Sequence, residues 1–374
     1  MRQDENIPLV DLKAQYLNIK NEIDRAIGNC ISDANFIKGK PVLDFEKKFS
    51  GYIGVNECVS CGNGTDALEL ILKALEIGPG DEVIVPALTW IATAEAVSNV
   101  GAEPVFIDIN LNDYTIDTEK IEELINFKTK AIIPVHLYGC PCDMDPILEI
   151  AERNKLFVIE DCAQAHGAEY SGRKVGSFGI ASAFSFFPSK NLGAFGDGGA
   201  VVSSNGELAE KIRMLANHGQ LKLRHFHQII GRNSRLDTLQ AAVLNIKLDY
   251  LDAWNEKRIE ASNHYRSRLN ETKSIIIPEP FKKKKHVFHI YAIRSKERER
   301  IIESLNNSNI SSGIHYPKPL PFLEAYSYKQ HVLKDFPNAV KVSEEILSLP
   351  IYPEISEVQI DAVCDAIVSK LFIH

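Results

Sequence analysis

The stretch from Ala181 to Ala200, with the sequence ASAFSFFPSKNLGAFGDGGA, constrains the fold of this chain more than any other. It begins with small and apolar residues that lack a helical period, which predicts a strand ending at Phe187. Pro188 cannot donate a ladder hydrogen bond, and the glycines that follow favour a turn. Lys190 lies in this turn, beside the aromatic run. An apolar wall lowers the pKa of an amine, so Lys190 is a candidate nucleophile. A surface lysine on a turn is the simpler alternative.

A second run, Leu156–Glu160, is short and apolar, which predicts a buried strand that ends at Asp161. Buried parallel strands present functional groups at their carboxyl ends, so we expect Asp161 and Lys190 at the same edge of one sheet. An amine and a carboxylate at neighbouring strand ends are what pyridoxal phosphate requires. The amine forms a Schiff base with the cofactor, and the carboxylate pairs with its pyridinium nitrogen.

The sequence GNGTDAL at 62–68 opens a helical pattern and supplies a third element. Backbone N–H groups at the start of a helix bind phosphate, which predicts a phosphate site here. An ordinary N-cap by Asn63 or Thr65 explains the same residues equally well. The three elements in one chain favour a pyridoxal phosphate site far more than any of them alone.

Strands and helices alternate from about residue 55 to residue 202, which predicts an α/β fold with a mainly parallel sheet. Beyond residue 254 the pattern changes to shorter elements. We therefore expect a large domain over residues 1–250 and a smaller α+β domain over 251–374. The expected strands lie at 82–86, 104–108, 131–136, 156–161, 183–187, 199–203 and 286–294, and the later helices at 236–254, 298–309 and 358–372.

The composition is that of an ordinary globular protein, with 45% hydrophobic and 25% charged residues in a chain of 374. The formal net charge of −8 argues against a general nucleic-acid binder. No apolar run reaches membrane length and the N-terminus lacks the apolar segment of a signal peptide, so we expect a cytoplasmic protein. The seven cysteines then favour reduced thiols over a zinc site, and no metal is expected.

Four long motifs carry a resemblance to a known family. They are HLYGCPCDMD at 136–145, IEDCAQAHGA at 159–168, FSFFPSKNLGAFGDGGA at 184–200 and GRNSRLDTLQAA at 231–242. Together they resemble the DegT/DnrJ/EryC1/StrS family of pyridoxal-phosphate sugar aminotransferases, over nearly the whole chain. The resemblance implies fold type I, the aspartate aminotransferase fold, with a large cofactor-binding domain and a smaller C-terminal domain.

The resemblance also implies roles for individual residues. Lys190 would form the Schiff base and then carry the proton during transfer, and Asp161 would keep the ring nitrogen protonated. Gln164 resembles the residue that contacts the ring hydroxyl. The other expected cofactor contacts are Gly64, Thr65 and Ser185 at the phosphate, Trp90 stacked on the ring, and Asn233 of a second subunit. The expected substrate contacts are Tyr138, Arg224, His315 and Tyr316.

The segment His218–Arg235 is basic in an otherwise acidic chain and contains no acidic residue. A solvated loop is the simpler interpretation, and an anion site for a diphosphate is the alternative. Because the resemblance places Asn233 against the cofactor phosphate of a neighbouring subunit, we expect a homodimer with shared active sites. The four cationic side chains of the segment are Lys222, Arg224, Arg232 and Arg235.

For three further features, a structural interpretation stands beside or in place of a functional one. The run Lys282–Lys285 lies in a proline-flanked loop and is expected to be solvated surface. His136, past the end of an expected strand, is expected to be buried and hydrogen-bonded, with a substrate contact as the alternative. Trp90 also follows a strand, and a tryptophan in the core or a loop is the alternative to ring stacking.

The activity implied by the resemblance is amino transfer from glutamate to the keto group, at C3, of a UDP- or dTDP-linked sugar. Pyridoxamine phosphate would be the intermediate cofactor form, and the product an amino sugar for a surface polysaccharide or glycoconjugate. Amination at C4 is one alternative. A pyridoxamine-dependent sugar dehydratase is less favoured, because such members carry histidine in place of Lys190. A non-catalytic sensor is also less favoured. Such a protein usually carries an additional DNA-binding module, and this sequence contains no additional basic helical segment of that kind. The segment at 318–326 departs from the family, since many members have a histidine near Phe322.

Overall fold

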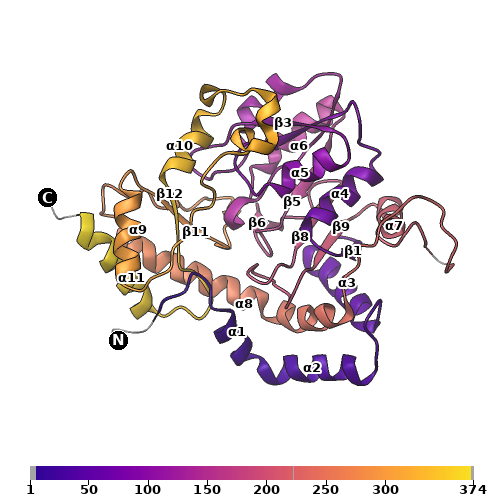
Figure 1. The fold of residues 1–374 in the computed structure, drawn as a ribbon, viewed down its shortest axis with the longest axis horizontal. Helices are drawn as coiled ribbons and strands as arrows, with labels where there is room; N and C mark the ends of the chain where they lie inside the picture. The colour runs from indigo at the N-terminus through magenta and orange to yellow at the C-terminus, as the bar shows by residue number, and fades with distance from the viewer. Residues whose placement is uncertain (1–5, 222, 372–374) are drawn as a thin grey trace.

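A computed structural model describes residues 6–221 and 223–371. A seven-stranded sheet forms the centre, in the order β1-β9-β8-β5-β4-β2-β3 (Figure 1). β9 is antiparallel to both of its neighbours, and the other neighbouring strands pair in parallel. The mainly parallel α/β sheet expected from the sequence is therefore confirmed. The strands are β1 (Glu57–Cys61), β2 (Glu82–Pro86), β3 (Glu103–Ile107), β4 (Thr129–Ile132), β5 (Phe157–Asp161), β8 (Ala181–Ser185) and β9 (Gly199–Ser203).

Several strands differ from expectation. β8 ends at Ser185 rather than at Phe187, because its pairing with β9 ends at Ser185 and Gly199. β4 ends at Ile132 rather than at His136, and Pro134, which has no N–H to donate, follows close behind. β1 was not expected, because its sequence ECVSC has no continuous apolar run. Its pairing with β9 nevertheless completes the sheet, and four of its five residues are buried.

Helices cover both faces of the sheet, and alternate residues of each strand pack against opposite layers. In β8, Ala183 belongs to the core formed with α4, α5 and α7, whereas Phe184 belongs to the core formed with α3 and α8. α6 packs on the latter face, over the far strands. The helices of the sheet layers are α3 (Lys40–Ile53), α4 (Gly64–Ala74), α5 (Ala92–Asn99), α6 (Met144–Asn154), α7 (Gly206–Leu215) and α8 (Thr238–Leu269).

The C-terminal part adds a separate core, which includes the far end of α8 (Figure 1). The strand expected at 286–294 is shorter, because Phe288 has a φ of 44° that interrupts extended backbone. The expected closing helix runs to Leu371, and residue 372 lies outside the described residues. α8 passes through residue 250, so the division at that residue stays a prediction. The remaining elements are α1 (Leu12–Asn18), α2 (Lys20–Ser32), β6 (Glu169–Tyr170), β7 (Arg173–Lys174), β10 (Lys284–Lys285), β11 (Tyr291–Arg294), α9 (Arg298–Asn307), α10 (Pro337–Glu345), β12 (Ile346–Leu349) and α11 (Glu357–Leu371).

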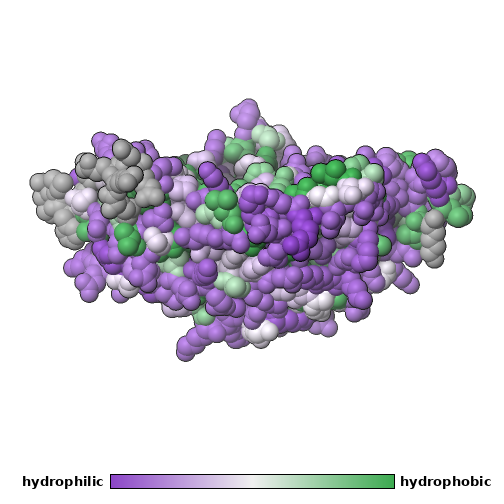
Figure 2. Space-filling view, turned by 90° about the horizontal axis from the view of Figure 1, so that it is seen from below, coloured by the Kyte–Doolittle hydropathy of each residue, from purple (hydrophilic) through white to green (hydrophobic). Residues whose placement is uncertain are grey.

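The surface seen from below is largely hydrophilic, and its hydrophobic residues form several separate patches (Figure 2). Within residues 6–221 and 223–371, no helix combines the length and the apolar character that crossing a bilayer requires.

Candidate active site

The end of β5 places Asp161 in a buried position at the carboxyl edge of the sheet. Its side chain is held from two sides. Thr93, in the first turn of α5, donates from Oγ1 to Asp161 Oδ2 over 2.8 Å, and the Ala163 N–H donates to Oδ1 over 3.1 Å. Burial raises the pKa of Asp161, while these hydrogen bonds and the charge of Lys190 oppose the rise. The carboxylate therefore has a fixed orientation and a cation within electrostatic reach.

Lys190 lies beyond the end of β8, the strand next to β5. The register pairs Asp161 with Ala183, so the two strands end at the same edge. The Lys190 N–H donates to the Phe187 carbonyl over 2.9 Å, which closes the turn around Pro188. The side chain is half-buried, and burial lowers the pKa of the amine to about 8 against the opposing charge of Asp161. At pH 7 about a tenth of such an amine is neutral, the form that a nucleophile needs.

The start of α4 lies against the end of β8. Gly64 and Thr65 are the first two residues of the helix, where N–H groups lack intrahelical acceptors. A Cβ atom on Gly64 would lie 2.8 Å from the Cβ of Ser185, so glycine is required for this approach. Asn63 caps the helix by accepting from the Asp66 N–H over 2.8 Å. The N-cap interpretation is thus confirmed, and the same geometry leaves a helix start beside a hydroxyl, which suits a phosphate.

Aromatic side chains form one wall of the candidate site. Trp90 is 59% exposed, and its ring lies 5.8 Å from that of Tyr316, centroid to centroid. Gln164 is buried beside them and donates from Nε2 to the Tyr316 hydroxyl over 3.0 Å. His315 is half-buried. Tyr138 is only 1% exposed, so, contrary to expectation, its side chain offers no surface to a substrate.

Arg232 is already neutralised within the subunit. Its guanidinium pairs with Asp66 over 2.7 Å and also with Glu69, both on α4. The neighbouring Ser234 accepts from the Gly62 N–H over 2.9 Å and donates to Asp66 over 2.5 Å. This part of the basic segment is therefore not a solvated loop, because carboxylates of the same subunit fasten it to the start of α4.

Arg224 and Arg235 line an open cavity of about 430 Å³ together with Lys38. None of the three forms an ion pair with a carboxylate of the described residues. Burial and the charge of Arg235 lower the pKa of Lys38. Asn233, which precedes Arg235 closely in the sequence, is exposed. Lys222 lies outside the described residues. A cationic cavity therefore faces solvent. The diphosphate site in this segment stays a prediction.

His136 is fully buried, as expected. Its Nε2 lies 3.1 Å from Glu160 Oε2, and the Cys142 N–H donates to Nδ1 over 3.0 Å. His136, Glu160 and Cys162 have possible metal-ligand atoms within 4.8 Å of one another. The Glu160 carboxylate, however, also accepts hydrogen bonds from three backbone N–H groups and a serine hydroxyl. We therefore assign this cluster to the support of β4 and β5.

Lys284 corrects another expectation. Its side chain is 3% exposed and pairs with Asp113 over 2.5 Å and with Asp143 over 3.1 Å. The run Lys282–Lys285 is therefore not uniformly solvated surface. The structure also adds Thr93 to the site, a residue that the sequence analysis did not single out.

An amine, a buried carboxylate and a helix start with hydroxyl groups thus meet at one edge of the sheet, and this donor set fits pyridoxal phosphate. The model of the DegT/DnrJ/EryC1/StrS aminotransferase family matches residues 17–368. The chain belongs to this family. As a member of the DegT/DnrJ/EryC1/StrS family, it is a pyridoxal-phosphate-dependent sugar aminotransferase of fold type I.

Individual relatives match over almost their full length. One from Acidithiobacillus ferrooxidans, named UDP-N-acetyl-3-dehydro-alpha-D-glucosamine 3-aminotransferase, is 45% identical and covers 98% of both chains. One from Geobacillus stearothermophilus, named pleiotropic regulatory protein, is 43% identical and covers 95% of both. The crystal structure of DesV from S. venezuelae in complex with a ketimine intermediate has a TM-score of 0.96 at 40% identity, covering 99% of both chains.

Proposed function

We propose that this enzyme converts the keto group at C3 of a UDP- or dTDP-linked sugar to an amine, with glutamate as the donor. The observation that carries the proposal is the placement of Lys190 and Asp161 at one sheet edge, in a member of this family. Supporting it, the A. ferrooxidans relative and relatives named for dTDP-linked 3-amino sugars are 41 to 45% identical. The product would serve the biosynthesis of an amino sugar for a surface polysaccharide or glycoconjugate.

The residues of the chain divide the work. Pyridoxal phosphate, when bound, supplies a ring that withdraws electrons from the carbon to be deprotonated. Lys190 acts as the nucleophile and moves the proton, because its amine titrates close to neutral pH. Asp161 holds a proton at the ring nitrogen. Gly64, Thr65 and Ser185 bind the phosphate at the start of α4.

The substrate side is formed by the aromatic wall and the cationic cavity. Trp90 stacks on the ring, and Gln164 contacts the ring hydroxyl. His315 and Tyr316 come from the C-terminal part and approach the sugar. Arg224 meets the diphosphate, since the cavity that it lines contains cations that pair with no carboxylate within residues 6–221 and 223–371.

The proposed enzyme is a homodimer with shared sites. Two segments around the cationic cavity expose large apolar side chains, and Ile230 is 97% exposed. Large apolar side chains exposed in two segments near the same cavity are typical of an interface. A C2 dimer would bury these side chains and would let the exposed Asn233 reach the phosphate of the other subunit. The exposed apolar residues are Phe36, Ile37, Leu43, Leu223, Phe226 and Ile230.

Two alternatives compete with this proposal. Amination at C4 is the alternative within the same family, and one relative, 37% identical, is named for another nucleotide-linked sugar as GDP-perosamine synthase. A non-catalytic regulatory role, the sensor, is supported by the name of the G. stearothermophilus relative, pleiotropic regulatory protein. Neither accounts better for Lys190, whose lowered pKa and place beside Asp161 serve catalysis. A dehydratase is disfavoured by the same lysine.

The test is a transamination assay on the purified protein loaded with pyridoxal phosphate. It uses glutamate with UDP- and dTDP-linked 3-keto and 4-keto sugars, and follows 2-oxoglutarate release and the position of the new amine by NMR. We expect turnover of a 3-keto sugar only. Turnover confined to 4-keto sugars would contradict the C3 assignment, and no turnover with any of these acceptors would favour the sensor.

A further inference from the structure

Tyr138 adopts a backbone conformation that tyrosine rarely takes. It lies just beyond β4 in a single 3-10 turn, Leu137–Gly139, with a φ of 58° and a ψ of 6°. This left-handed region is unfavourable for a bulky side chain, and such residues persist only where the surroundings hold them in place. Strain of this kind is often found where a backbone group must point in a particular direction.

The backbone N–H of Tyr138 points at Gln164. It donates to Gln164 Oε1 over 2.7 Å, and Gln164 Nε2 donates to the Tyr316 hydroxyl over 3.0 Å. These two contacts fix which end of the amide is oxygen and which is nitrogen. The nitrogen carries two N–H bonds, and the described part of the chain supplies an acceptor for only one of them. Gln164 Nε2 thus keeps one N–H bond that can donate to a ligand, while Oε1 is held by the Tyr138 N–H.

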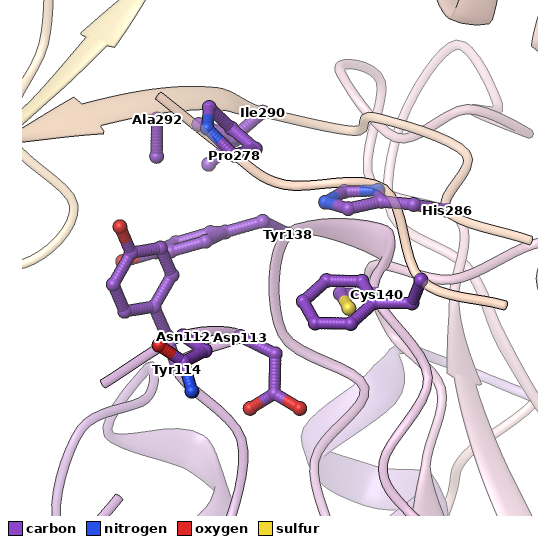
Figure 3. A pocket seen from close by; sticks show the side chains of 10 residues that line it. Asn112, Asp113, Tyr114, Tyr138, Cys140, Pro278, His286, Ile290 and Ala292 are labelled. Atoms are coloured by element: carbon purple, nitrogen blue, oxygen red, sulfur yellow. The ribbon is translucent and has the colours of Figure 1, made fainter. Parts of the chain in front are cut away.

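The side chain of Tyr138 is anchored by contacts of its own, and it lines a small cavity of about 10 Å³ (Figure 3). Its ring lies edge-on to that of Tyr114 at 5.9 Å, and its hydroxyl donates to the His315 carbonyl. The Ile290 N–H donates to the Tyr138 carbonyl over 3.3 Å. Next to it, a Cβ atom on Gly139 would lie 2.9 Å from Val287. Contacts from three separate segments therefore hold the strained turn.

We propose that Tyr138 is a positioning residue: its left-handed backbone fixes the Gln164 amide so that nitrogen, and not oxygen, faces the ring oxygen of pyridoxal phosphate. The inference rests on the proposed placement of Gln164 at the ring. A donor at that oxygen favours its anionic form and so lowers the pH at which the bound cofactor loses its proton. Turning the amide over would replace this donor with a repulsive carbonyl oxygen.

The experiment compares variants of the holoenzyme by the pH midpoint of the visible absorbance of the bound cofactor. Tyr138→Val and Tyr138→Gly both remove the ring, but β-branched valine opposes a positive φ and glycine adopts it freely. Tyr138→Phe removes only the hydroxyl contact with His315. Gln164→Ala gives the full effect of losing the amide. Asp161 and Lys190, the charged groups beside the ring, are unchanged throughout.

We expect Gln164→Ala and Tyr138→Val to raise the midpoint by about 1 to 2 pH units, the size of one hydrogen bond to a charged group. Tyr138→Gly and Tyr138→Phe should stay near the wild-type value. In the double variant of Gln164→Ala with Tyr138→Val, no further shift is expected, which a merely structural role would not produce. If Tyr138→Val does not fold, Tyr138→Ala takes its place, because alanine also disfavours a positive φ.

Equal shifts in Tyr138→Val and Tyr138→Gly would overturn the inference, as would a Tyr138→Val shift that persists without the Gln164 amide. If Gln164→Ala leaves the midpoint unchanged while Lys190→Ala abolishes the absorbance band, this inference fails and the proposed site stands. If the wild-type protein shows no band that depends on Lys190, the proposed site itself fails.

Discussion

Thr93→Val is expected to change the pH dependence of catalysis without damage to the fold. Thr93 is 1% exposed and donates to Asp161 Oδ2 over 2.8 Å, and valine has nearly the same shape. A hydrogen bond to a charged group contributes about 1.5 to 3 kcal/mol. One pKa unit corresponds to about 1.4 kcal/mol, so the loss should raise the pKa of Asp161 by about 1 to 2 units.

The sign follows from the roles proposed for the site. Burial already raises the pKa of Asp161, and the Thr93 hydrogen bond lowers it. Without that bond the carboxylate becomes protonated at higher pH and no longer pairs with the ring nitrogen. The acid limb of the kcat/KM profile should therefore move up by about 1 to 2 pH units, with a loss of about 10- to 100-fold below it. Activity should recover towards the wild-type value at alkaline pH.

The assay is kcat/KM for transamination across the pH range, with thermal unfolding measured in parallel. Thr89→Val is the matched control, because Thr89 is also buried and its Oγ1 lies 3.3 Å from that of Thr93, but it makes no hydrogen bond to Asp161. If the two variants give the same profile, the hydrogen bond from Thr93 does not govern Asp161 and the reasoning is refuted.

Three further predictions follow from the same contacts. Lys190→Ala should lower turnover by several orders of magnitude while circular dichroism and the melting temperature stay close to wild type; near-normal turnover would contradict its role. Lys190→Ala and Asn233→Trp, each inactive alone, should give partial activity in a doubly tagged co-expressed heterodimer, and an inactive heterodimer would exclude shared sites. Lys284→Met should destabilise the fold by about 3 to 5 kcal/mol in urea unfolding, because it leaves Asp113 buried without its cation. Adding Asp113→Asn should restore part of that loss, and no restoration would show that the pair is not the cause.

The parts of the fold that could be predicted are those with a local signal. Apolar runs located β2, β5 and β9 to within a residue or two, and the carboxyl-end rule brought Asp161 and Lys190 to one edge. β1 has no such run and was missed. Its burial results from α3 and α4 packed around it and from pairing with β9, whose residues are far away in sequence.

Partners distant in sequence explain the errors at the site. Lys284 looked solvated because its neighbours are lysines, whereas Asp113 and Asp143 are more than a hundred residues away. Arg232 looked free for a ligand because the carboxylates that neutralise it lie on α4. A list of charges along the chain shows how many are present but not which are paired.

The helix α8 couples the stability of the sheet domain to that of the C-terminal part. It is unbroken over 32 residues; Leu244 and Leu251 pack in the core shared with α3, while Tyr265 and Leu269 pack in the C-terminal core. A cut at residue 250 would leave each fragment with a helix stub and an uncovered apolar face. Helix formation is cooperative, so fraying that begins in one core spreads towards the other. We expect that neither part is stable as a separate fragment. Loss of order at the C-terminal end should also destabilise the sheet edge that binds the cofactor.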